Sequence, residues 1–246
     1  MLTKNQQKLI KSLHEKKNRT ELGLFLVEGT KSVSELLNSD FEIEILLTTT
    51  EFFDKYGEQI RDKSKIYEIV NQFEIEKVSA FETNDSVLAV AKQKINIDTE
   101  EKGLILMLDE IKDPGNLGTI IRMADWYGVS KIIASTNTVD FYNPKVIASS
   151  MGAFTRVNLF YTDLKEYLSK TKLPIYGAFL GGENVHDIDY PKDGILVMGN
   201  ESKGISKEIE DIIKKKITIP SYGKTESLNV SIATAIILDN WKRKTA

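Results

Sequence analysis

The sequence contains no cysteine in its 246 residues, which excludes disulfides, thiolate metal ligands and a cysteine nucleophile. Histidine is almost as scarce, since only His14 and His186 occur, so we expect no histidine-based metal site. Long apolar runs are also missing, because the longest ones, near residues 104–108 and 232–238, are too short to cross a bilayer. The N-terminal residues lack an apolar stretch of signal-peptide length. We therefore expect a soluble cytoplasmic protein with no metal ion and no membrane partner.

The composition is that of a globular protein, with 41% apolar and 28% charged residues, and its length suits one large domain or two modest ones. The net charge of -3 is unevenly distributed. Residues 1–31 hold seven Lys or Arg against three Asp or Glu, residues 32–101 seven against sixteen, and residues 102–246 nineteen against seventeen. Basic flanks favour a phosphate backbone as partner, although solvated lysine-rich ends explain this charge pattern equally well.

The first part of the chain predicts a small α/β unit. Apolar spacing indicates a basic helix over residues 5–17, and a second helix capped by Thr30 over residues 30–37. Strands are expected at residues 24–27, 42–47 and 86–91. The polar stretch 93–102 shows no long periodicity and is predicted to be a linker. It separates a domain of residues 1–92 from one of residues 103–246.

The second part alternates between strand and helix patterns and predicts a mostly parallel sheet with helices on both faces. Strands are expected at 104–108, 131–134, 175–179, 195–198 and 216–219. Helices are expected from 116 to 127 and at 144–152, 163–170, 206–213 and 229–241. Ligands of such sheets bind at the carboxyl ends of the strands, and three unusual loops fall there.

The first loop covers residues 109–122. The Pro-Gly pair at 114–115 predicts a tight turn, and Asn116 is suited to cap the helix that follows. Arg122 lies early in that helix, where the macrodipole disfavours a cation, and Gly118 clears the surface one turn before it. A phosphate beside Arg122 would explain this arrangement. The alternative is an ion pair with a nearby carboxylate, namely Asp109, Asp113 or Asp125.

The second loop covers residues 197–204. Gly199 and Gly204 have P-loop spacing, but Ile-Ser at 205–206 replaces the obligatory Lys-Ser/Thr, and no G-x-G-x-x-G follows a strand. The sequence therefore offers neither a P-loop nor a Rossmann nucleotide site. Gly199 would let a ligand approach the backbone and Glu201 would project a carboxylate. The alternative is an ordinary glycine-rich turn.

The third loop places Glu226, Ser227, Asn229 and Ser231 at the start of a nearly all-apolar helix. One of these polar residues would be enough to cap the helix, because a single side-chain oxygen satisfies the first free amides. The apolar helix is expected to be buried in the core or in a subunit interface. We interpret the additional polar groups as one wall of a site, with redundant capping as the alternative.

In this order, the three loops resemble those of the SpoU (TrmH) family of RNA ribose methyltransferases, within the SPOUT superfamily. The matching segments are 113–124, 198–204, 219–220 and 226–230. The resemblance is strong over residues 103–246, whereas residues 1–92 resemble more loosely an α/β, ribosomal-protein-like substrate-binding domain. Two departures are Ser202, where many members carry Gly, and residues 221–224, where some relatives carry Met and shorter loops.

The resemblance implies a C-terminal domain with a SPOUT-type parallel sheet and a deep trefoil knot, which patterning alone could not predict. It also implies a homodimer, formed in part by the C-terminal helix. The cofactor would be S-adenosylmethionine. It would be held through backbone groups of the knot loops and of a loop after residue 179, near Leu180, Gly181, Gly199, Ile219 and Leu228.

By the same resemblance Arg122 would be the catalytic residue. The surrounding hydrogen-bonding set would be Asn116, Glu201, Ser227 and Asn229, with Glu201 holding Arg122 or Asn229. Free arginine is too weakly acidic to serve as a base at neutral pH. Arg122 would therefore act either as a base in a strongly perturbed environment or as a group that orients phosphate and stabilises the forming alkoxide, and the sequence leaves both open.

The predicted function is methyl transfer from S-adenosylmethionine to a ribose 2′-hydroxyl of structured RNA, without a metal ion. The two-domain layout favours ribosomal RNA over transfer RNA. A second hypothesis is a non-catalytic RNA-binding or ribosome-assembly factor that keeps the fold, and a phosphoryl-transfer enzyme ranks third. The target nucleotide, and the choice between housekeeping and antibiotic resistance, are not encoded in any motif.

Overall fold

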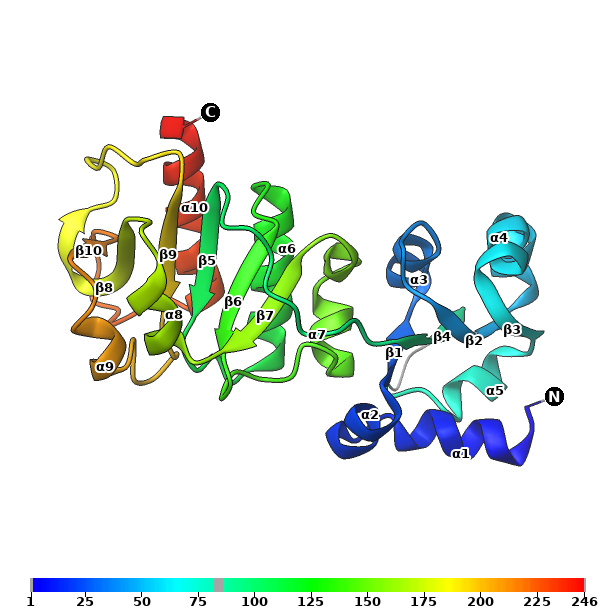
Figure 1. Cartoon of the computed structure of the whole chain (residues 1–246). Helices are drawn as coiled ribbons and strands as arrows, with labels where there is room; N and C mark the ends of the chain where they lie inside the picture. Colours follow the sequence, from blue (N-terminus) through cyan, green and yellow to red (C-terminus); the bar gives the residue numbers. More distant parts are fainter. Residues whose placement is uncertain (1, 82–85, 246) are drawn as a thin grey trace. The chain divides into compact units, whose positions relative to one another are not determined.

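The computed structural model describes residues 2–81 and 86–245, and the chain divides into two compact units (Figure 1). Unit 1 contains Met1–Ile95 and Asp140–Thr155, and unit 2 contains Asn96–Val139 and Arg156–Ala246. Residues 140–155 thus fold with the N-terminal part of the chain. The predicted domains, 1–92 and 103–246, are functional assignments and stay predictions.

Unit 1 is built on a mixed sheet in the order β1-β4-β2-β3. β4 pairs antiparallel with β1 and β2, and β2 pairs parallel with β3. The strands are β1 Leu24–Glu28, β2 Ile43–Thr48, β3 Ser64–Ile69 and β4 Val87–Lys92. The helices are α1 Lys4–Ser12, α2 Lys16–Leu22, α3 Thr30–Leu37, α4 Thr50–Lys63, α5 Gln72–Glu76, α7 Pro144–Ser149 and the 3-10 turn η1 Ala153–Thr155. The three strands predicted in this part are confirmed, each shifted by no more than about one residue at its ends.

The prediction of one helix over residues 5–17 is wrong, because the helix stops after Ser12 and restarts at Lys16. The buried side chain of Arg19 stabilises the bend. Its Nη1 donates to the carbonyls of Leu13 at 2.9 Å and His14 at 2.7 Å, which the end of α1 leaves free. Its Nη2 donates to Oδ2 of Asp140 at 2.7 Å, so the same guanidinium ties residues 140–155 to unit 1.

The N-cap of α3 also differs from prediction. Gly29 holds that position with φ of 86°, and Thr30 is the first helical residue without a side-chain cap. A positive φ of this size favours glycine, so the chain turns from β1 into α3 through backbone geometry instead of a capping hydroxyl.

Unit 2 contains a six-stranded sheet in the order β10-β8-β9-β5-β6-β7, with every strand pair parallel. The strands are β5 Leu104–Leu108, β6 Lys131–Ser135, β7 Asn158–Thr162, β8 Ile175–Asn184, β9 Gly194–Met198 and β10 Lys215–Thr218. The helices are α6 Pro114–Trp126, α8 Leu164–Lys170, α9 Lys207–Glu210 and α10 Val230–Thr245. The predicted parallel sheet is confirmed, and the knotted threading of its C-terminal segment stays a prediction from the resemblance.

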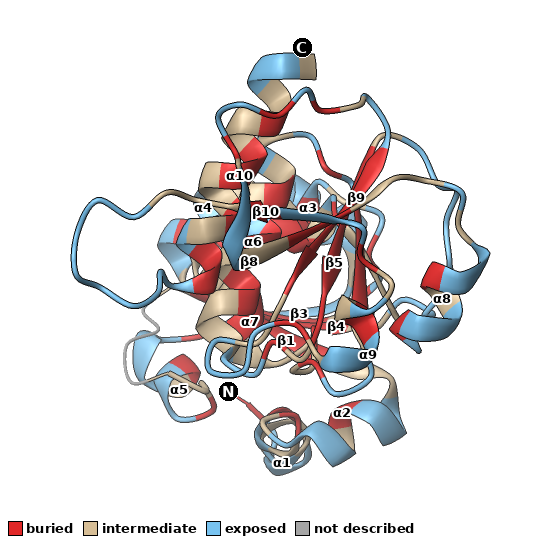
Figure 2. Ribbon diagram, turned by 90° about the vertical axis from the view of Figure 1, so that its left-hand side faces the viewer, coloured by how far each residue is buried: buried red, intermediate tan, exposed pale blue. Residues whose placement is uncertain are grey.

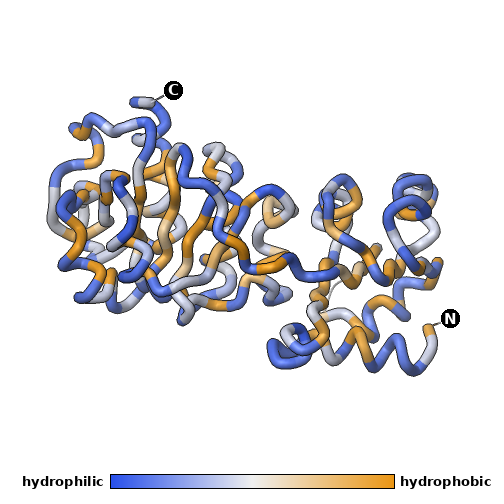
Figure 3. Tube along the Cα trace, in the orientation of Figure 1, coloured by the Kyte–Doolittle hydropathy of each residue, from blue (hydrophilic) through white to orange (hydrophobic). Residues whose placement is uncertain are grey.

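The centre of this sheet is covered on both faces. β5 and β9 are buried along their whole length, and the strands form hydrophobic stretches between hydrophilic loops (Figures 2 and 3). On one face, Ile105, Met107 and Val197 pack in a core with α8 and α9. On the other, α10 packs against α6, and its buried Trp241 stacks on Tyr190 and donates from Nε1 to the carbonyl of Pro191.

Two strands of unit 2 depart from the prediction. β7 was not expected, because all five of its residues are only half-buried and give no clear apolar run. β8 runs on through residues 180–184, so Leu180 and Gly181 lie within a strand and not in the loop expected after residue 179. Gly182 permits this extension, since a Cβ there would lie 2.5 Å from the carbonyl oxygen of Lys216 on β10. Within the described residues, no helix has both the length and the apolar character needed to span a membrane.

Candidate functional site

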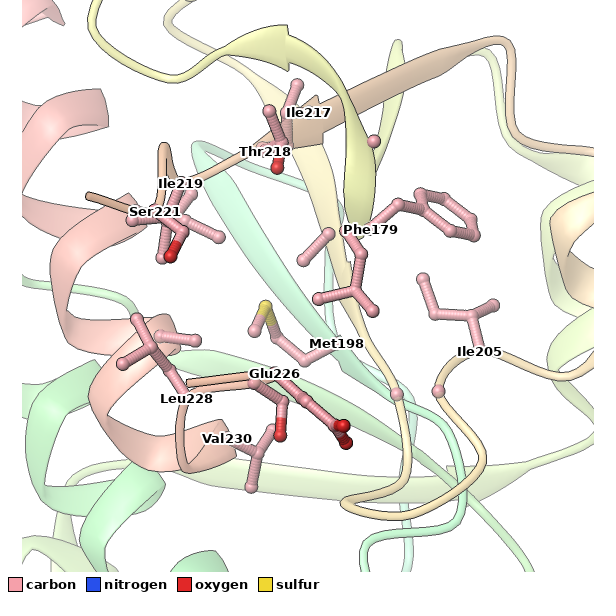
Figure 4. A pocket seen from close by; sticks show the side chains of 18 of the residues that line it. Phe179, Met198, Ile205, Ile217, Thr218, Ile219, Ser221, Glu226, Leu228 and Val230 are labelled. Atoms are coloured by element: carbon pink, nitrogen blue, oxygen red, sulfur yellow. The ribbon is translucent and has the colours of Figure 1, made fainter. Parts of the chain in front are cut away.

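A cavity of about 1120 Å³ lies in unit 2 at the carboxyl ends of β9 and β10, beside residues 178–181 in the middle of β8 (Figure 4). Its walls come from residues 178–181, 198–205, 216–223 and 225–228, together with α10. The five residues predicted to bind cofactor all line it: Leu180, Gly181, Gly199, Ile219 and Leu228. Glu201 and Ser227 of the predicted catalytic set line it as well. Their roles stay predictions, but the sheet does bring these distant segments to one place.

Both apolar and polar side chains line the cavity. Figure 4 shows Phe179 and Ile205 on one side, Leu228 and Val230 on the other, and the Met198 thioether between them. Such walls, with a few convergent polar side chains, are typical of sites for small organic ligands. Of these apolar residues only Leu228 was predicted from sequence as a site residue, although Phe179 and Met198 stand at or near the ends of two predicted strands.

Three side chains of the predicted catalytic set form a directed chain of hydrogen bonds beside the cavity. Asn229 donates from Nδ2 to Oδ1 of Asn116 at 2.9 Å, and Asn116 donates from Nδ2 to Oε1 of Glu201 at 2.9 Å. An ionised carboxylate only accepts hydrogen bonds, so Glu201 fixes the amide orientation of Asn116, and Asn116 in turn fixes Asn229. Glu201 therefore contacts Asn229 only through Asn116, and within residues 2–81 and 86–245 it makes no hydrogen bond or ion pair with Arg122.

The side chain of Asn116 is available for these hydrogen bonds because, contrary to prediction, Asn116 does not cap its helix. Asp113 is the N-cap of α6, and its Oδ1 accepts from the Asn116 amide at 2.8 Å. At the start of α10 the capping residue is Asn229, whose Oδ1 accepts from the Ser231 amide at 2.9 Å and from the Ser231 hydroxyl. Asn229 therefore begins α10 with its oxygen and contacts α6 with its nitrogen. Ser231 is buried at this cap, outside the cavity lining.

Arg122 stands apart from the hydrogen-bonded chain. It is exposed on α6 and makes no ion pair or hydrogen bond with any residue in 2–81 or 86–245. The expected carboxylate alternatives are engaged elsewhere: Asp125 pairs with Arg156 at 2.8 Å, and Asp109 accepts from the Ser206 amide at 2.7 Å. Gly118 is buried, so the cleared surface expected beside Arg122 is not found. The guanidinium donors of Arg122 are directed to solvent and available to an anion.

Gly199 serves the loop itself and not only ligand access. A Cβ at this position would lie 2.3 Å from the carbonyl carbon of Gly204 and the nitrogen of Ile205. Asn200 and Gly204 exchange two backbone hydrogen bonds of 2.9 Å, which close the loop on Gly199. The loop thus requires glycine at 199 for its own backbone packing, and the ligand contact of Gly199 stays a prediction.

Five charged side chains line the cavity, and two of them, Lys216 and Glu210, form an ion pair. Lys216 donates to Glu210 and lies over the Phe179 ring, with 4.7 Å from Nζ to the ring centroid. This hydrogen bond, with the charges of Lys207 and Lys216, lowers the pKa of Glu210 against the opposing effect of burial. No three His, Asp or Glu side chains gather as metal ligands in the part of the chain that the structure describes.

Comparison with known proteins adds two family matches. Residues 103–239 match the SpoU rRNA Methylase family, and residues 4–89 match the MRM3-like substrate binding domain. The Bacillus subtilis protein named 23S rRNA (guanosine(2553)-2′-O)-methyltransferase RlmP is 30% identical over 96% of this chain and 95% of its own length.

Two further relatives have different extents of match. The tRNA (guanosine(18)-2′-O)-methyltransferase of Aquifex aeolicus is 34% identical, but over only 60% of this chain and 72% of its own length. Among solved structures, an AdoMet-bound rRNA methyltransferase from Sinorhizobium meliloti has a TM-score of 0.87 at 28% identity, covering 99% of this chain and 96% of that one.

Proposed function

Because the chain belongs to the SpoU rRNA methylase family, we propose that it transfers a methyl group from S-adenosylmethionine to a ribose 2′-hydroxyl of structured RNA. The observation that carries the proposal is the cavity at the carboxyl ends of β9 and β10, with the Asn229-Asn116-Glu201 hydrogen bonds beside it. It joins all three sequence loops that carry the resemblance.

The substrate class is proposed to be ribosomal RNA. The relative named for 23S rRNA matches 96% of this chain. That match includes most of residues 4–89, which match the MRM3-like substrate binding domain. The relative named for transfer RNA matches only 60% of this chain. The N-terminal unit is therefore the part that argues for the ribosomal class. These relatives are bacterial, and a ribosomal substrate in a bacterium supports action in the cytoplasm.

The cavity fits S-adenosylmethionine in size and chemistry. Its volume of about 1120 Å³ exceeds what such a ligand occupies, and its apolar walls suit an adenine ring. At Gly181 an added Cβ would meet nothing within 4 Å, so the lining is open there. When bound, the cofactor supplies an electrophilic methyl group on a sulfonium.

The side chains supply positioning and charge. Asn116 holds Oε1 of Glu201, and the other carboxylate oxygen remains available to a hydroxyl donor. The exposed donors of Arg122 suit an RNA phosphate next to the target ribose and the negative charge that develops on its oxygen. Of the two roles open for Arg122, we therefore propose the orienting and electrostatic one. Ser227 and the backbone near Leu228 complete the wall between cofactor and ribose.

We further propose a homodimer formed through α6 and α10. These two helices pack together, and each exposes a large apolar side chain: Trp126 is 81% exposed and Ile232 is 53% exposed. Large exposed apolar groups on adjoining helices are typical of an interaction surface. Sedimentation of the wild-type chain against Trp126→Glu tests this, since the variant should sediment as a monomer.

The test of activity uses methyl-labelled cofactor with ribosomal RNA prepared from cells that lack this gene. We expect label in an alkali-resistant dinucleotide, because a 2′-O-methyl blocks cleavage at that position. Label on a base would contradict the assignment of the ribose 2′-hydroxyl as the methyl acceptor. Arg122→Ala should remove turnover and leave cofactor affinity nearly unchanged, whereas retained turnover would contradict the role of Arg122. A non-catalytic RNA-binding factor would show neither turnover nor heat of cofactor binding.

A further inference from the structure

We propose that Glu226 recognises the positive charge of the methyl donor's sulfonium, so that the cavity prefers the donor over its demethylated product. The inference rests on the proposed function. Glu226 belongs to the segment between β10 and α10 and lines the cavity, and Figure 4 shows its carboxylate directed into the space that Met198 and Val230 also line. It makes no hydrogen bond or ion pair with the rest of the described chain, residues 2–81 and 86–245.

The charges of the cavity wall support a cationic ligand. Five charged side chains line it: Glu201, Lys203, Glu210, Lys216 and Glu226. Lys216 and Glu210 neutralise each other in an ion pair. The other three leave one net negative charge. S-adenosylmethionine carries a sulfonium, an ammonium and a carboxylate, so its net charge is +1, and loss of the methyl group makes the product neutral overall.

Glu226 is a better match for this cation than Glu201. Oε1 of Glu201 already accepts from Asn116, which directs that carboxylate toward the hydrogen-bonded chain beside α6. The Glu226 carboxylate is exposed on the cavity wall and makes no hydrogen bond or ion pair within residues 2–81 and 86–245, so it is free to meet a cation in the cavity. A ligand that fills the cavity displaces solvent from this carboxylate and strengthens the attraction further.

The preference has a kinetic consequence. The sulfonium charge disperses as the methyl group leaves sulfur, so Glu226 stabilises the bound donor at least as much as the transition state. Removing its charge should therefore raise KM for the donor without lowering kcat. The neutral product gains nothing from Glu226 and leaves more readily than the donor.

The experiment measures binding of S-adenosylmethionine, S-adenosylhomocysteine and sinefungin by calorimetry to the full-length wild type, Glu226→Gln and the control Glu208→Gln. Sinefungin carries a protonated amine where the sulfonium stands. Glu208 is exposed and lies outside the cavity lining. In Glu226→Gln we expect affinity for the two cationic ligands to fall about fivefold to tenfold, with affinity for S-adenosylhomocysteine unchanged. Glu208→Gln should bind all three like the wild type.

Each other outcome has a distinct meaning. An equal loss for all three ligands would assign Glu226 to the ammonium or to general shape and overturn the inference. Unchanged affinities, or a lower kcat at an unchanged KM, would overturn it too. If the wild type binds none of the three, the proposed cofactor itself fails, and that failure is separate from the role of Glu226.

Discussion

Asn229→Asp separates the two roles of Asn229, because it should preserve the helix cap and break the contact with α6. In the wild type, Oδ1 caps α10 and Nδ2 donates to Asn116. An aspartate keeps an oxygen for the cap and loses the donor. Asn116 cannot compensate by turning its amide, since its oxygen would then face the Glu201 carboxylate, which has no proton to donate.

The magnitudes can be estimated for each role. Asp and Asn are about equally good N-caps, so the contribution of the cap to the free energy of unfolding should stay within about 0.5 kcal/mol of wild type. A negative charge at a helix N-terminus is itself favourable by about 0.3–1 kcal/mol, which works in the same direction. Misplacing Asn116 and Glu201 loses one hydrogen bond and weakens another that involves a charge, about 1–3 kcal/mol together. We therefore expect turnover to fall about tenfold to a hundredfold.

The assays are thermal unfolding and single-turnover methyl transfer at saturating cofactor. Asn229→Ala is the comparison, since it removes both roles and should lose about 1 kcal/mol of stability along with turnover. If Asn229→Asp transfers methyl groups at the wild-type rate, the hydrogen-bonded chain has no part in the reaction. If it unfolds as readily as Asn229→Ala, the assignment of Asn229 as N-cap is wrong.

Three other changes test the loop, unit 1 and one buried phenol. Gly199→Ala should weaken cofactor binding at least about tenfold and lower stability by about 1–3 kcal/mol, because its Cβ would collide with loop backbone at 2.3 Å; calorimetry and denaturant unfolding measure both. Asp140→Asn leaves the 2% exposed Arg19 without its counter-charge and should cost about 3 kcal/mol in urea unfolding, whereas a loss below about 1 kcal/mol would contradict the buried pair. Burial raises the pKa of Tyr142 to about 12, so the folded state keeps a proton that the unfolded state loses from its ordinary value of 10.0 upward. Stability should thus fall between about pH 10 and pH 12, and Tyr142→Phe should reduce that fall.

The sequence predicted the elements whose burial is uniform. β5 and β9 are apolar at every position because both faces of the sheet are covered, and their bounds were predicted to within about one residue. β7 and β3 were missed because the side chains of β7 are half-buried and most of those of β3 are exposed, so neither strand carries a regular apolar pattern. The bend after α1 was missed because Arg19, whose guanidinium donates to the carbonyls at the bend, is paired with the distant Asp140, which no local pattern can reveal.

The candidate site shows the same division between local and distant causes. Both asparagines are good capping residues, and sequence alone predicted a cap at Asn116 as readily as at Asn229. Asp113 stands three residues before Asn116 and caps α6 by accepting from the Asn116 backbone amide. The side-chain amide of Asn116 is therefore available to Glu201 and Asn229. At α10 no earlier residue replaces Asn229, so one amide must serve both the cap and α6. The polar residues at the start of α10 therefore have separate places in the structure. Asn229 caps the helix, and Ser231 is buried at that cap. Glu226 and Ser227 line the cavity.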